Sequence, residues 1–289
     1  MLSHEEMVGL QAEKHELINS KEFKSEEEFV LHLIHSFAYH QVAKCAVGKT
    51  VLDLGCNTGY GSKILAGMAA KVIGVDVSEN AVSIARETNQ APGIEFHLID
   101  GKQLPFEADT FDVVISCQVI EHIVDYEVYI GEIQRVLTPG GIVVFTTPNA
   151  LLRLDPGMKP WNPFHVTEFN ADEIGELLRS HFPAVVIQGL FAKKSTYMVE
   201  KDRLSRARAA ARQKAQPDKK QSKMARRFEK LFKRLWPRPA SRPERFLDKH
   251  QLNDLFYRSE ELDKALDLMA VCSSETPAVE DAACLIGGK

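Results

Sequence analysis

A glycine-containing turn after the first apolar run carries the strongest chemical signal in the chain. The stretch VLDLGCNTGYG, at residues 51–61, spaces three glycines as G-x-x-x-G-x-G directly after a β-rich run. Glycine lets a backbone turn sharply and approach a ligand without a Cβ clash. This spacing differs from the G-x-G-x-x-G of dinucleotide-binding turns. Asp53, two residues before the first glycine, instead suits a ligand that carries positive charge.

Two further carboxylates close the next two apolar runs. Asp76 ends VIGVD, and a carboxylate at the end of a second strand can accept hydrogen bonds from both ribose hydroxyls of a bound nucleoside. The alternative for Asp76 is a cap on the helix that follows it. Asp100 ends IEFHLID, with Gly101 beside it.

Candidate groups for chemistry on a second substrate follow the fourth and fifth β-rich runs. Gln118, Glu121 and His122 lie in SCQVIEHI, and His165 lies in WNPFHVTEF. Ligands of doubly wound sheets bind at the carboxyl ends of the strands, so we expect these side chains to meet there. A histidine or carboxylate at that edge can act as a general base on a hydroxyl group. Purely structural histidines are the alternative.

The elements that must position these residues form an alternating pattern. Short β-rich runs alternate with helical ones, which is typical of a parallel sheet covered on both faces. We predict strands at Thr50–Gly55, Lys71–Val77, Ile94–Ile99, Phe111–Cys117, Gly141–Thr147, Ala184–Phe191 and Ala265–Ser273. Helices are predicted at Gly59–Ala69, Ser78–Asn89, Asp125–Leu137 and Ala171–His181. The predicted fold class is therefore α/β, with a doubly wound sheet.

Over residues 50–149 these motifs resemble those of the class I S-adenosylmethionine (SAM)-dependent methyltransferases. The resemblance implies SAM as cofactor, S-adenosylhomocysteine as product, and a Rossmann-like, mostly parallel sheet of seven strands. It also implies an antiparallel hairpin strand at the end of that sheet, which residues 265–273 can supply. The residues that we assign to the cofactor on this basis are Asp53, Gly55, Cys56, Asn57, Gly59, Asp76, Val77, Asp100, Gly101 and Gln118.

The pair Glu121–His122 with the later His165 resembles an arrangement in two groups of O-methyltransferases. These are the ubiquinone-pathway enzymes and the enzymes that methylate the terminal 2′-OH of small RNAs. Members of both hold a divalent metal with an E-x-x-E-H stretch and a later histidine. Gln118 replaces the first glutamate here, and a neutral amide is a weaker ligand for a hard cation. We therefore predict no metal, assign Glu121, His122 and His165 to metal-free catalysis, and keep a divalent metal as the alternative.

Composition and cysteine usage are those of an ordinary globular protein. The chain is 44% hydrophobic and 26% charged, and it contains no apolar run of the roughly 20 residues that cross a bilayer. Its acidic beginning does not read as a signal peptide. The five cysteines form no C-x-x-C pair, which favours reduced thiols and a cytoplasmic location.

A basic segment interrupts the pattern before the last predicted strand. Residues 193–249 contain 20 Lys and Arg against 6 Asp and Glu. Within them, residues 224–236 (MARRFEKLFKRLW) place their apolar side chains on one helical stripe. Such a helix packs on the protein, lies on an anionic membrane surface, or contacts nucleic acid. The scarcity of aromatic residues outside the stripe argues against nucleic acid.

We divide the chain into four parts. They are an N-terminal helical cap at 1–48, a SAM-binding core at 49–192, a basic helical insertion at 193–250, and the final strand with a tail at 251–289. The run NPFHVTEF, at residues 162–169, resembles bacterial methyltransferases of polysaccharide and secondary-metabolite pathways.

The predicted function is O-methylation of a sugar hydroxyl or another small hydroxyl acceptor, including one on a lipid-linked glycan at the inner membrane surface. The alternatives are an RNA or protein methyltransferase that docks through the insertion, and a catalytically silent SAM-binding protein.

Overall fold

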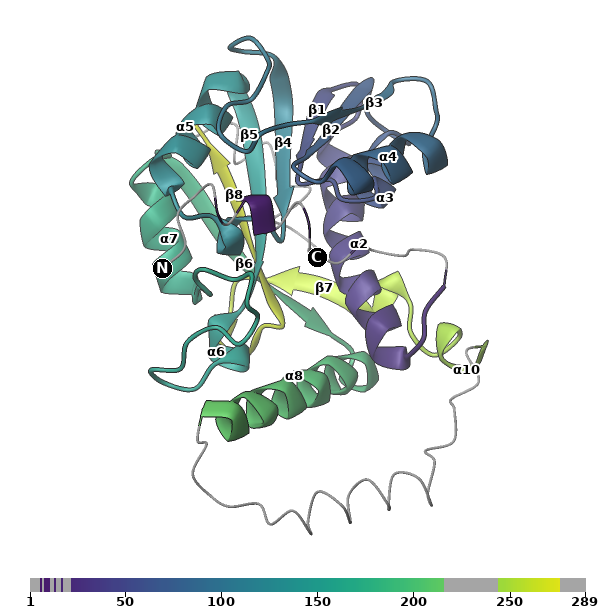
Figure 1. Ribbon diagram of the computed structural model, residues 1–289, viewed down its shortest axis with the longest axis vertical. Coiled ribbons are helices and arrows are strands. Elements are labelled where there is room, and N and C mark those ends of the chain that lie inside the picture. Colours follow the sequence, from purple (N-terminus) through teal and green to yellow (C-terminus); the bar gives the residue numbers. More distant parts are fainter. Residues whose placement is uncertain are drawn as a thin grey trace.

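The fold is a single mixed sheet with helices on both faces. The computed structural model describes residues 22–215 and 244–275, together with a few positions between residues 6 and 17. In this part of the chain, eight strands pair in the order β3-β2-β1-β4-β5-β8-β6-β7 (Figure 1). The strands are β1 Thr50–Leu54, β2 Lys71–Asp76, β3 Ile94–Leu98, β4 Phe111–Cys117, β5 Leu137–Pro148, β6 Ala184–Ala192, β7 Leu255–Arg258 and β8 Asp267–Ser273.

The direction of the strands sets the place of the site. Strands β1 to β5 are parallel, and β8 enters antiparallel between β5 and β6. Strands β1, β4 and β8 are almost wholly buried, which explains why they read as continuous apolar runs. The strand order reverses between β1 and β4, and ligands of such sheets bind outside the carboxyl ends of the strands at this reversal.

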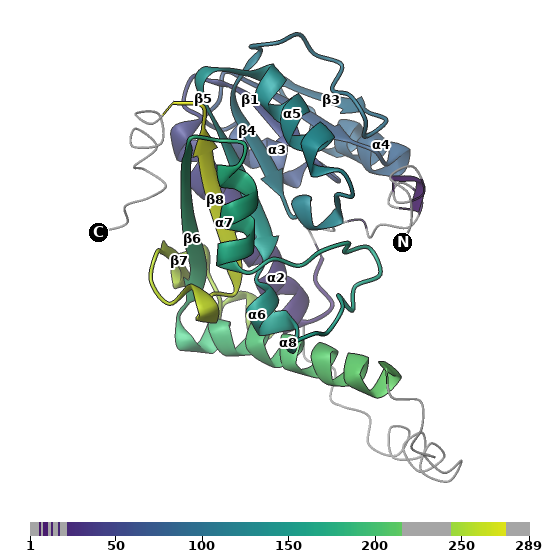
Figure 2. The same ribbon diagram turned by 90° about the vertical axis from the view of Figure 1, so that its left-hand side faces the viewer.

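Helices cover the two faces of the sheet in separate layers (Figure 2). Helices α2 and α3 pack against the side chains of Val51, Val113 and Val144. Helices α5 and α7 pack on the opposite face, against Leu52 and Val114. The helical elements are α2 Glu26–Cys45, α3 Tyr60–Leu65, α4 Glu79–Thr88, η1 Ile120–His122, α5 Tyr126–Val136, α6 Ala150–Arg153, α7 Ala171–Arg179, α8 Lys194–Ala215, α10 Glu244–Leu247, η2 Leu252–Asp254 and η3 Leu262–Lys264.

Side-chain caps explain where several of these helices begin. The hydroxyl of Ser78 accepts from the backbone N–H of Ala81 at the start of α4. Asn170 caps α7 in a capping box with Glu173. Each cap satisfies a backbone N–H that has no partner inside the helix.

Helix α8 lies at the edge of the sheet where ligands bind. It begins directly after β6, whose carboxyl end points to the same edge as those of the parallel strands (Figure 1). It contacts α2 and α6, and its Leu204 is buried. The first part of the predicted insertion therefore packs on the core, whereas residues 224–236 lie outside the described residues.

The predicted strands agree with the structure except for one additional edge strand and the start of β5. The sequence predicts seven strands, but the structure has eight, because β7 pairs with β6 as a short edge strand. Strand β5 begins at Leu137 rather than Gly141, because Leu137 pairs with Phe111 ahead of a bulge. Helix α3 is shorter than predicted and ends at Leu65.

The cysteines differ in part from the prediction of five reduced thiols. Cys56, Cys117 and Cys272 are free and buried. Cys45, the last residue of α2, is disulfide-bonded, so the prediction is wrong for this residue. Among the described helices, none combines the length and the apolar content needed to cross a bilayer.

Candidate functional site

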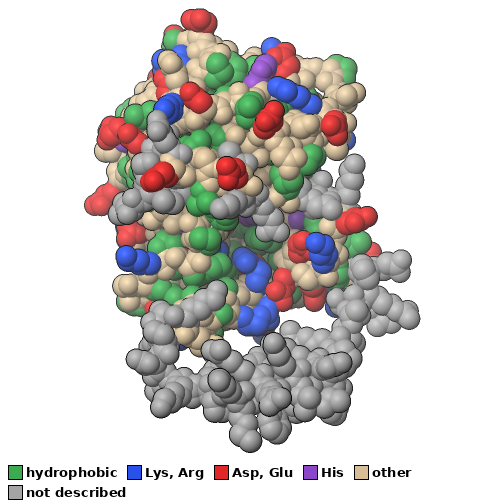
Figure 3. All heavy atoms as spheres, in the orientation of Figure 1, with side chains coloured by type: hydrophobic (Ala, Val, Ile, Leu, Met, Phe, Trp, Pro, Cys, Tyr) green, Lys and Arg blue, Asp and Glu red, His purple; other side chains and the backbone are tan. Residues whose placement is uncertain are grey.

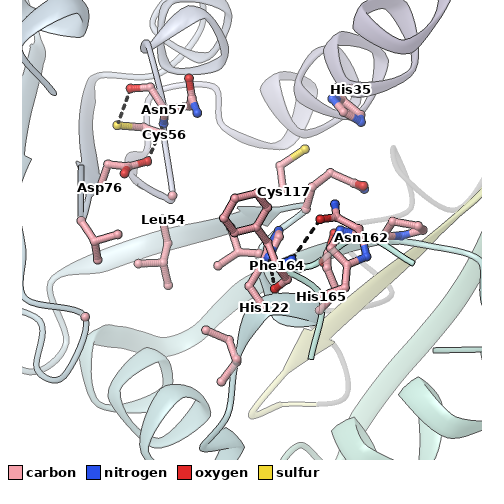
Figure 4. Close-up of a pocket in the computed structure, with 18 of the residues that line it drawn as sticks. His35, Leu54, Cys56, Asn57, Asp76, Cys117, His122, Asn162, Phe164 and His165 are labelled. Carbon is pink, nitrogen blue, oxygen red and sulfur yellow. Dashed lines mark hydrogen bonds between the residues drawn. The ribbon is translucent and has the colours of Figure 1, made fainter. Parts of the chain in front are cut away.

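A cavity of about 520 Å³ opens at the carboxyl ends of the parallel strands. Figure 4 shows Cys56, Asn57 and Asp76 on one side of it, and His122 and His165 on the other. One cavity thus joins the glycine turn to the polar groups that follow β4 and β5. The predicted residues that line it are Gly55, Cys56, Asn57, Asp76, Val77, Gly101, Gln118, Glu121, His122 and His165.

A side chain at Gly55 or Gly59 in the glycine turn would clash with neighbouring atoms. Gly55 has a φ of 83°, and a Cβ there would lie 2.5 Å from the Cγ2 of Val119. Gly59, with a φ of 78°, precedes α3, and a Cβ there would lie 2.7 Å from the ring of Phe96. Both glycines are therefore required by the turn itself. Gly55 faces the cavity, whereas Gly59 packs away from it.

Asp76 holds the turn in place from the end of β2. Its Oδ2 accepts from the backbone N–H of Asn57 at 2.8 Å, and its Oδ1 accepts from that of Ser78 at 2.9 Å. Each carboxylate oxygen has two lone pairs, so both can also accept from ligand hydroxyls. Asp76 thus both caps the turn region and lines the cavity.

Asp53 lies behind the turn rather than on the cavity. It is fully buried, and it accepts hydrogen bonds from the hydroxyls of Tyr39 at 3.0 Å and Ser62 at 2.6 Å. Burial raises the pKa of this carboxyl group to about 6. The structure therefore joins Asp53 to α2 and α3 and does not bring it to the cavity surface, where we expected it.

Asp53 makes a testable contribution to the pH dependence of stability. Because its folded pKa of about 6 is raised, its stabilising contribution is complete below pH 4 and is lost as the pH rises through 6. We expect the free energy of unfolding of the parent, relative to Asp53→Asn, to fall by up to about 3 kcal/mol between pH 4 and 7. Urea titrations of both proteins without ligand measure this difference. A difference that stays constant with pH would contradict the assignment.

Asp100 also lies off the cavity. It is exposed, and its Oδ1 accepts from the backbone N–H groups of Lys102 at 2.9 Å and Gln103 at 3.3 Å. These bonds, the first above all, lower the pKa of Asp100. Its neighbour Gly101 does line the cavity, with Val77. The local turn therefore accounts for the Asp100 side chain.

The side of the cavity opposite the glycine turn, here called the acceptor side, is built from η1 and the segment after α6. The backbone oxygen of Glu121 accepts from the N–H of Val166 at 2.8 Å, which ties the two segments together. The Nδ1 of His122 lies 2.8 Å from the backbone oxygen of Phe164. The rings of His122 and His165 meet edge to face, with centroids 4.8 Å apart (Figure 4). The two histidines that the sequence separates thus form one pair.

A buried glutamate that the sequence analysis missed orients His165. The Oε1 of Glu168 lies 2.8 Å from the Nδ1 of His165, and its Oε2 accepts from the Nε of Arg153 at 2.8 Å. Burial alone would raise the pKa of Glu168, but the hydrogen bonds from His165 and Arg153 outweigh it, so the pKa is lowered. A carboxylate at Nδ1 makes that nitrogen the donor and leaves the lone pair on Nε2. The H-x-x-E spacing was the available signal.

The same residues can be tested for a fit to a divalent ion. Glu121, His122 and His165 each offer one ligand atom, and these atoms lie within 4.8 Å of one another. Histidines that bind metal usually donate their other ring nitrogen to a carboxylate or carbonyl, as both histidines do here. Burial raises the pKa of Glu121. The donor set therefore fits a divalent ion. The amide nitrogen of the neighbouring Gln118 donates to Asp267 at 2.9 Å.

Known proteins are similar to the part of this chain that carries the glycine turn. Residues 52–145 match the family described as "Methyltransferase domain". A probable S-adenosylmethionine-dependent methyltransferase of Mycolicibacterium smegmatis is 38% identical over 147 residues, which is 50% of this chain and 56% of that relative. A ubiquinone biosynthesis O-methyltransferase of Rhizobium rhizogenes is 33% identical over 108 residues, 37% of this chain and 44% of the relative.

The chain thus spans about half the length of the curated relatives that it matches. The solved structure of the YcgJ protein of Bacillus subtilis has a TM-score of 0.48 at 17% identity, covering 84% of this chain and 99% of that one. The match at residues 52–145 includes the glycine turn, Asp76 and the η1 segment. Residues 52–145 therefore form a methyltransferase domain, and this part of the chain is similar to SAM-dependent methyltransferases.

Proposed function

We propose that this protein transfers the methyl group of SAM to a hydroxyl group of a small acceptor. The observation that carries the proposal is His165, which Glu168 orients and which lines the same cavity as the glycine turn and Asp76. The turn and Asp76 would hold the cofactor. The histidine pair would then face the acceptor at the other end of the cavity.

The proposed reaction is an in-line displacement at the methyl carbon of the sulfonium. Sulfur is a good leaving group, so the protein mainly holds the acceptor oxygen and the methyl carbon about 3 Å apart and collinear. As the oxygen attacks, the Nε2 of His165 takes its proton, and the new C–O bond replaces the C–S bond. Glu168 keeps the imidazole in the required tautomer and stabilises the imidazolium that forms. S-adenosylhomocysteine and the methyl ether are the products.

A divalent ion, when bound, would lower the pKa of the acceptor hydroxyl and share this task with the histidine. We expect methyl transfer to proceed without one, because an oriented His165 already supplies a base. Dialysis against EDTA should therefore leave the rate unchanged, and calorimetric titration with Mn²⁺ should show no tight site. Loss of activity that Mn²⁺ restores, with Mn²⁺ binding abolished in Glu121→Gln, would assign these residues to a metal.

We propose a sugar hydroxyl or another small hydroxyl compound as the acceptor, including one on a lipid-linked glycan. The resemblance of residues 162–169 to enzymes of polysaccharide pathways supports this class, and Asn162, Phe164 and His165 of this run line the cavity. Contact of residues 224–236 with an anionic membrane remains part of the proposal, although they lie outside the described residues.

The test is transfer from methyl-labelled SAM to cell extract divided into small metabolites, lipid-linked glycans, RNA and protein. We expect label in one of the first two fractions. Label confined to RNA or protein, or no label at all, would contradict the proposed function.

A further inference from the structure

We propose that the acceptor carries an oxyanion, a carboxylate or a phosphate, and that Arg153 and Arg203 bind it. This inference rests on the proposed function and deepens it by naming the charge of the substrate. Both arginines line the cavity together with His165, and both also line a small recess beside it. In Figure 3, basic side chains lie at the lower edge of the hollow in the centre of this face.

Arg153 ends α6 and is held rigidly by its surroundings. Its side chain is only 7% exposed, its Nε donates to Glu168 at 2.8 Å, and its guanidinium stacks 4.2 Å above the ring centroid of Trp161. Glu168 bonds only the Nε edge, and within the described chain no other group accepts from the terminal nitrogens of Arg153. A guanidinium fixed in this way presents a planar fork of donors that matches an oxyanion.

Arg203 reaches the same place from α8. Its Nε and Nη2 donate to the two carboxylate oxygens of Glu200, both at 2.6 Å. The Nη1 edge is left without an acceptor among the described residues. Burying the N–H donors of a charged group without hydrogen-bond partners is costly. A substrate that offered no oxygen atoms to these donors would therefore bind poorly.

Two of the four carboxyl groups around the arginines pair with them, and burial disfavours the charged form of the other two. Glu168 and Glu200 each neutralise one arginine. Asp267, beside the recess, has its pKa raised well above the usual value by burial, with Glu121 and Glu200 adding to the effect. Burial, with the charges of His32, Arg203 and Arg153, lowers the pKa of His35 to about 3, so this ring is neutral. The recess thus holds the guanidinium groups of both arginines beside buried groups whose charged form burial disfavours.

The position of the oxyanion also places the reacting hydroxyl. Glu168 bonds Arg153 and His165 at the same distance of 2.8 Å, so one carboxylate aligns the anion site with the base. An acceptor anchored on Arg153 would present a hydroxyl a few bonds away to His165. Uronic acids, other hydroxy acids and sugar phosphates have this arrangement.

The test measures the charge of the methylated product. The full-length protein is incubated with labelled SAM and the fraction of extract that accepts label, and the product is applied to an anion exchanger at pH 7. We expect the product to bind, and release by phosphatase distinguishes a phosphate from a carboxylate. A neutral product overturns this inference while leaving methyl transfer intact. If no product forms, the proposed function fails, and the inference fails with it.

Variants link the product charge to the two arginines. Arg153→Gln and Arg203→Gln should each raise the KM for the methyl acceptor about 10- to 100-fold. Arg153→Lys should raise this KM by less. Binding of S-adenosylhomocysteine, measured by calorimetry, should stay unchanged and shows that the variants fold. Arg206→Gln is the matched control, because Arg206 is an exposed residue of α8 that pairs with Glu27. An unchanged KM in both Gln variants overturns the assignment.

Discussion

His165→Ala is expected to lower kcat about 100-fold or more and to leave the affinity for SAM unchanged. The loss follows from geometry: the Nδ1 of His165 is committed to Glu168, so Nε2 carries the lone pair that can take the acceptor proton. His165 lies on the acceptor side of the cavity, away from the glycine turn, and therefore has no direct role in holding the cofactor (Figure 4). Initial rates and calorimetry with SAM measure the two effects.

Glu168→Gln tests whether orientation matters as much as the ring itself. Glutamine keeps the size of the side chain but loses the charge that stabilises an imidazolium, so we expect a smaller loss in kcat than in His165→Ala. Arg153 would keep an acceptor only if the amide oxygen turned to it. Initial rates of Glu168→Gln and His165→Ala, measured under the same conditions, compare the two losses.

Two further variants decide which group is the base. His40→Ala is the matched control, because His40 is exposed on α2 and does not line the cavity. His122→Ala should cost less than His165→Ala, because its Nδ1 bonds a neutral backbone oxygen. If only His122→Ala is slow, the base is His122. If His122→Ala and His165→Ala both turn over at the parental rate, the proposed acceptor site is wrong.

The central sheet could be predicted closely because most of its strands, among them β1, β2, β4 and β8, are largely buried. Such strands read as unbroken apolar runs ended by Gly, Asp or Asn, and β1, β2, β3 and β4 begin where the sequence predicts. Strand β7 could not be found in this way. It has four residues, LFYR, only the first of which is fully buried, so it lacks the apolar run of a central strand. Its pairing with β6 depends on tertiary structure alone.

The two sides of the candidate site also differ in how well the sequence predicts them. The cofactor side is local in sequence, since one turn and the ends of β2 and β3 supply it. The acceptor side is not local: Glu168 bonds Arg153 across 15 residues, and Arg203 joins them from α8. The sequence analysis found His165 by its residue type but could not find the partner that orients it. Asp53 was assigned to the cofactor by its acidic type, and the sequence could not predict that its carboxylate accepts hydrogen bonds from Tyr39 and Ser62.

Asp76→Ala is expected to weaken SAM binding about 100-fold or more. Two hydrogen bonds from ribose hydroxyls to a carboxylate would be lost, and each such charged bond contributes roughly 1.5–3 kcal/mol. The variant also releases the backbone N–H groups of Asn57 and Ser78, which loosens the turn that the cofactor must contact. Calorimetry with SAM measures the affinity, and thermal unfolding shows whether the fold persists.

Asp100→Asn is the informative comparison for Asp76→Ala. Both residues end a strand of the same sheet, but Asp100 is exposed and bonds only its own turn, so its variant should bind SAM nearly as well as the parent. A comparable loss in Asp100→Asn would place the cofactor against that carboxylate as well, as the family resemblance implies. Unchanged affinity in Asp76→Ala would remove the ribose assignment. The methyl group can be aligned with His165 only if the ribose is anchored. Without the ribose assignment, the alignment that the proposed mechanism requires would therefore have no support.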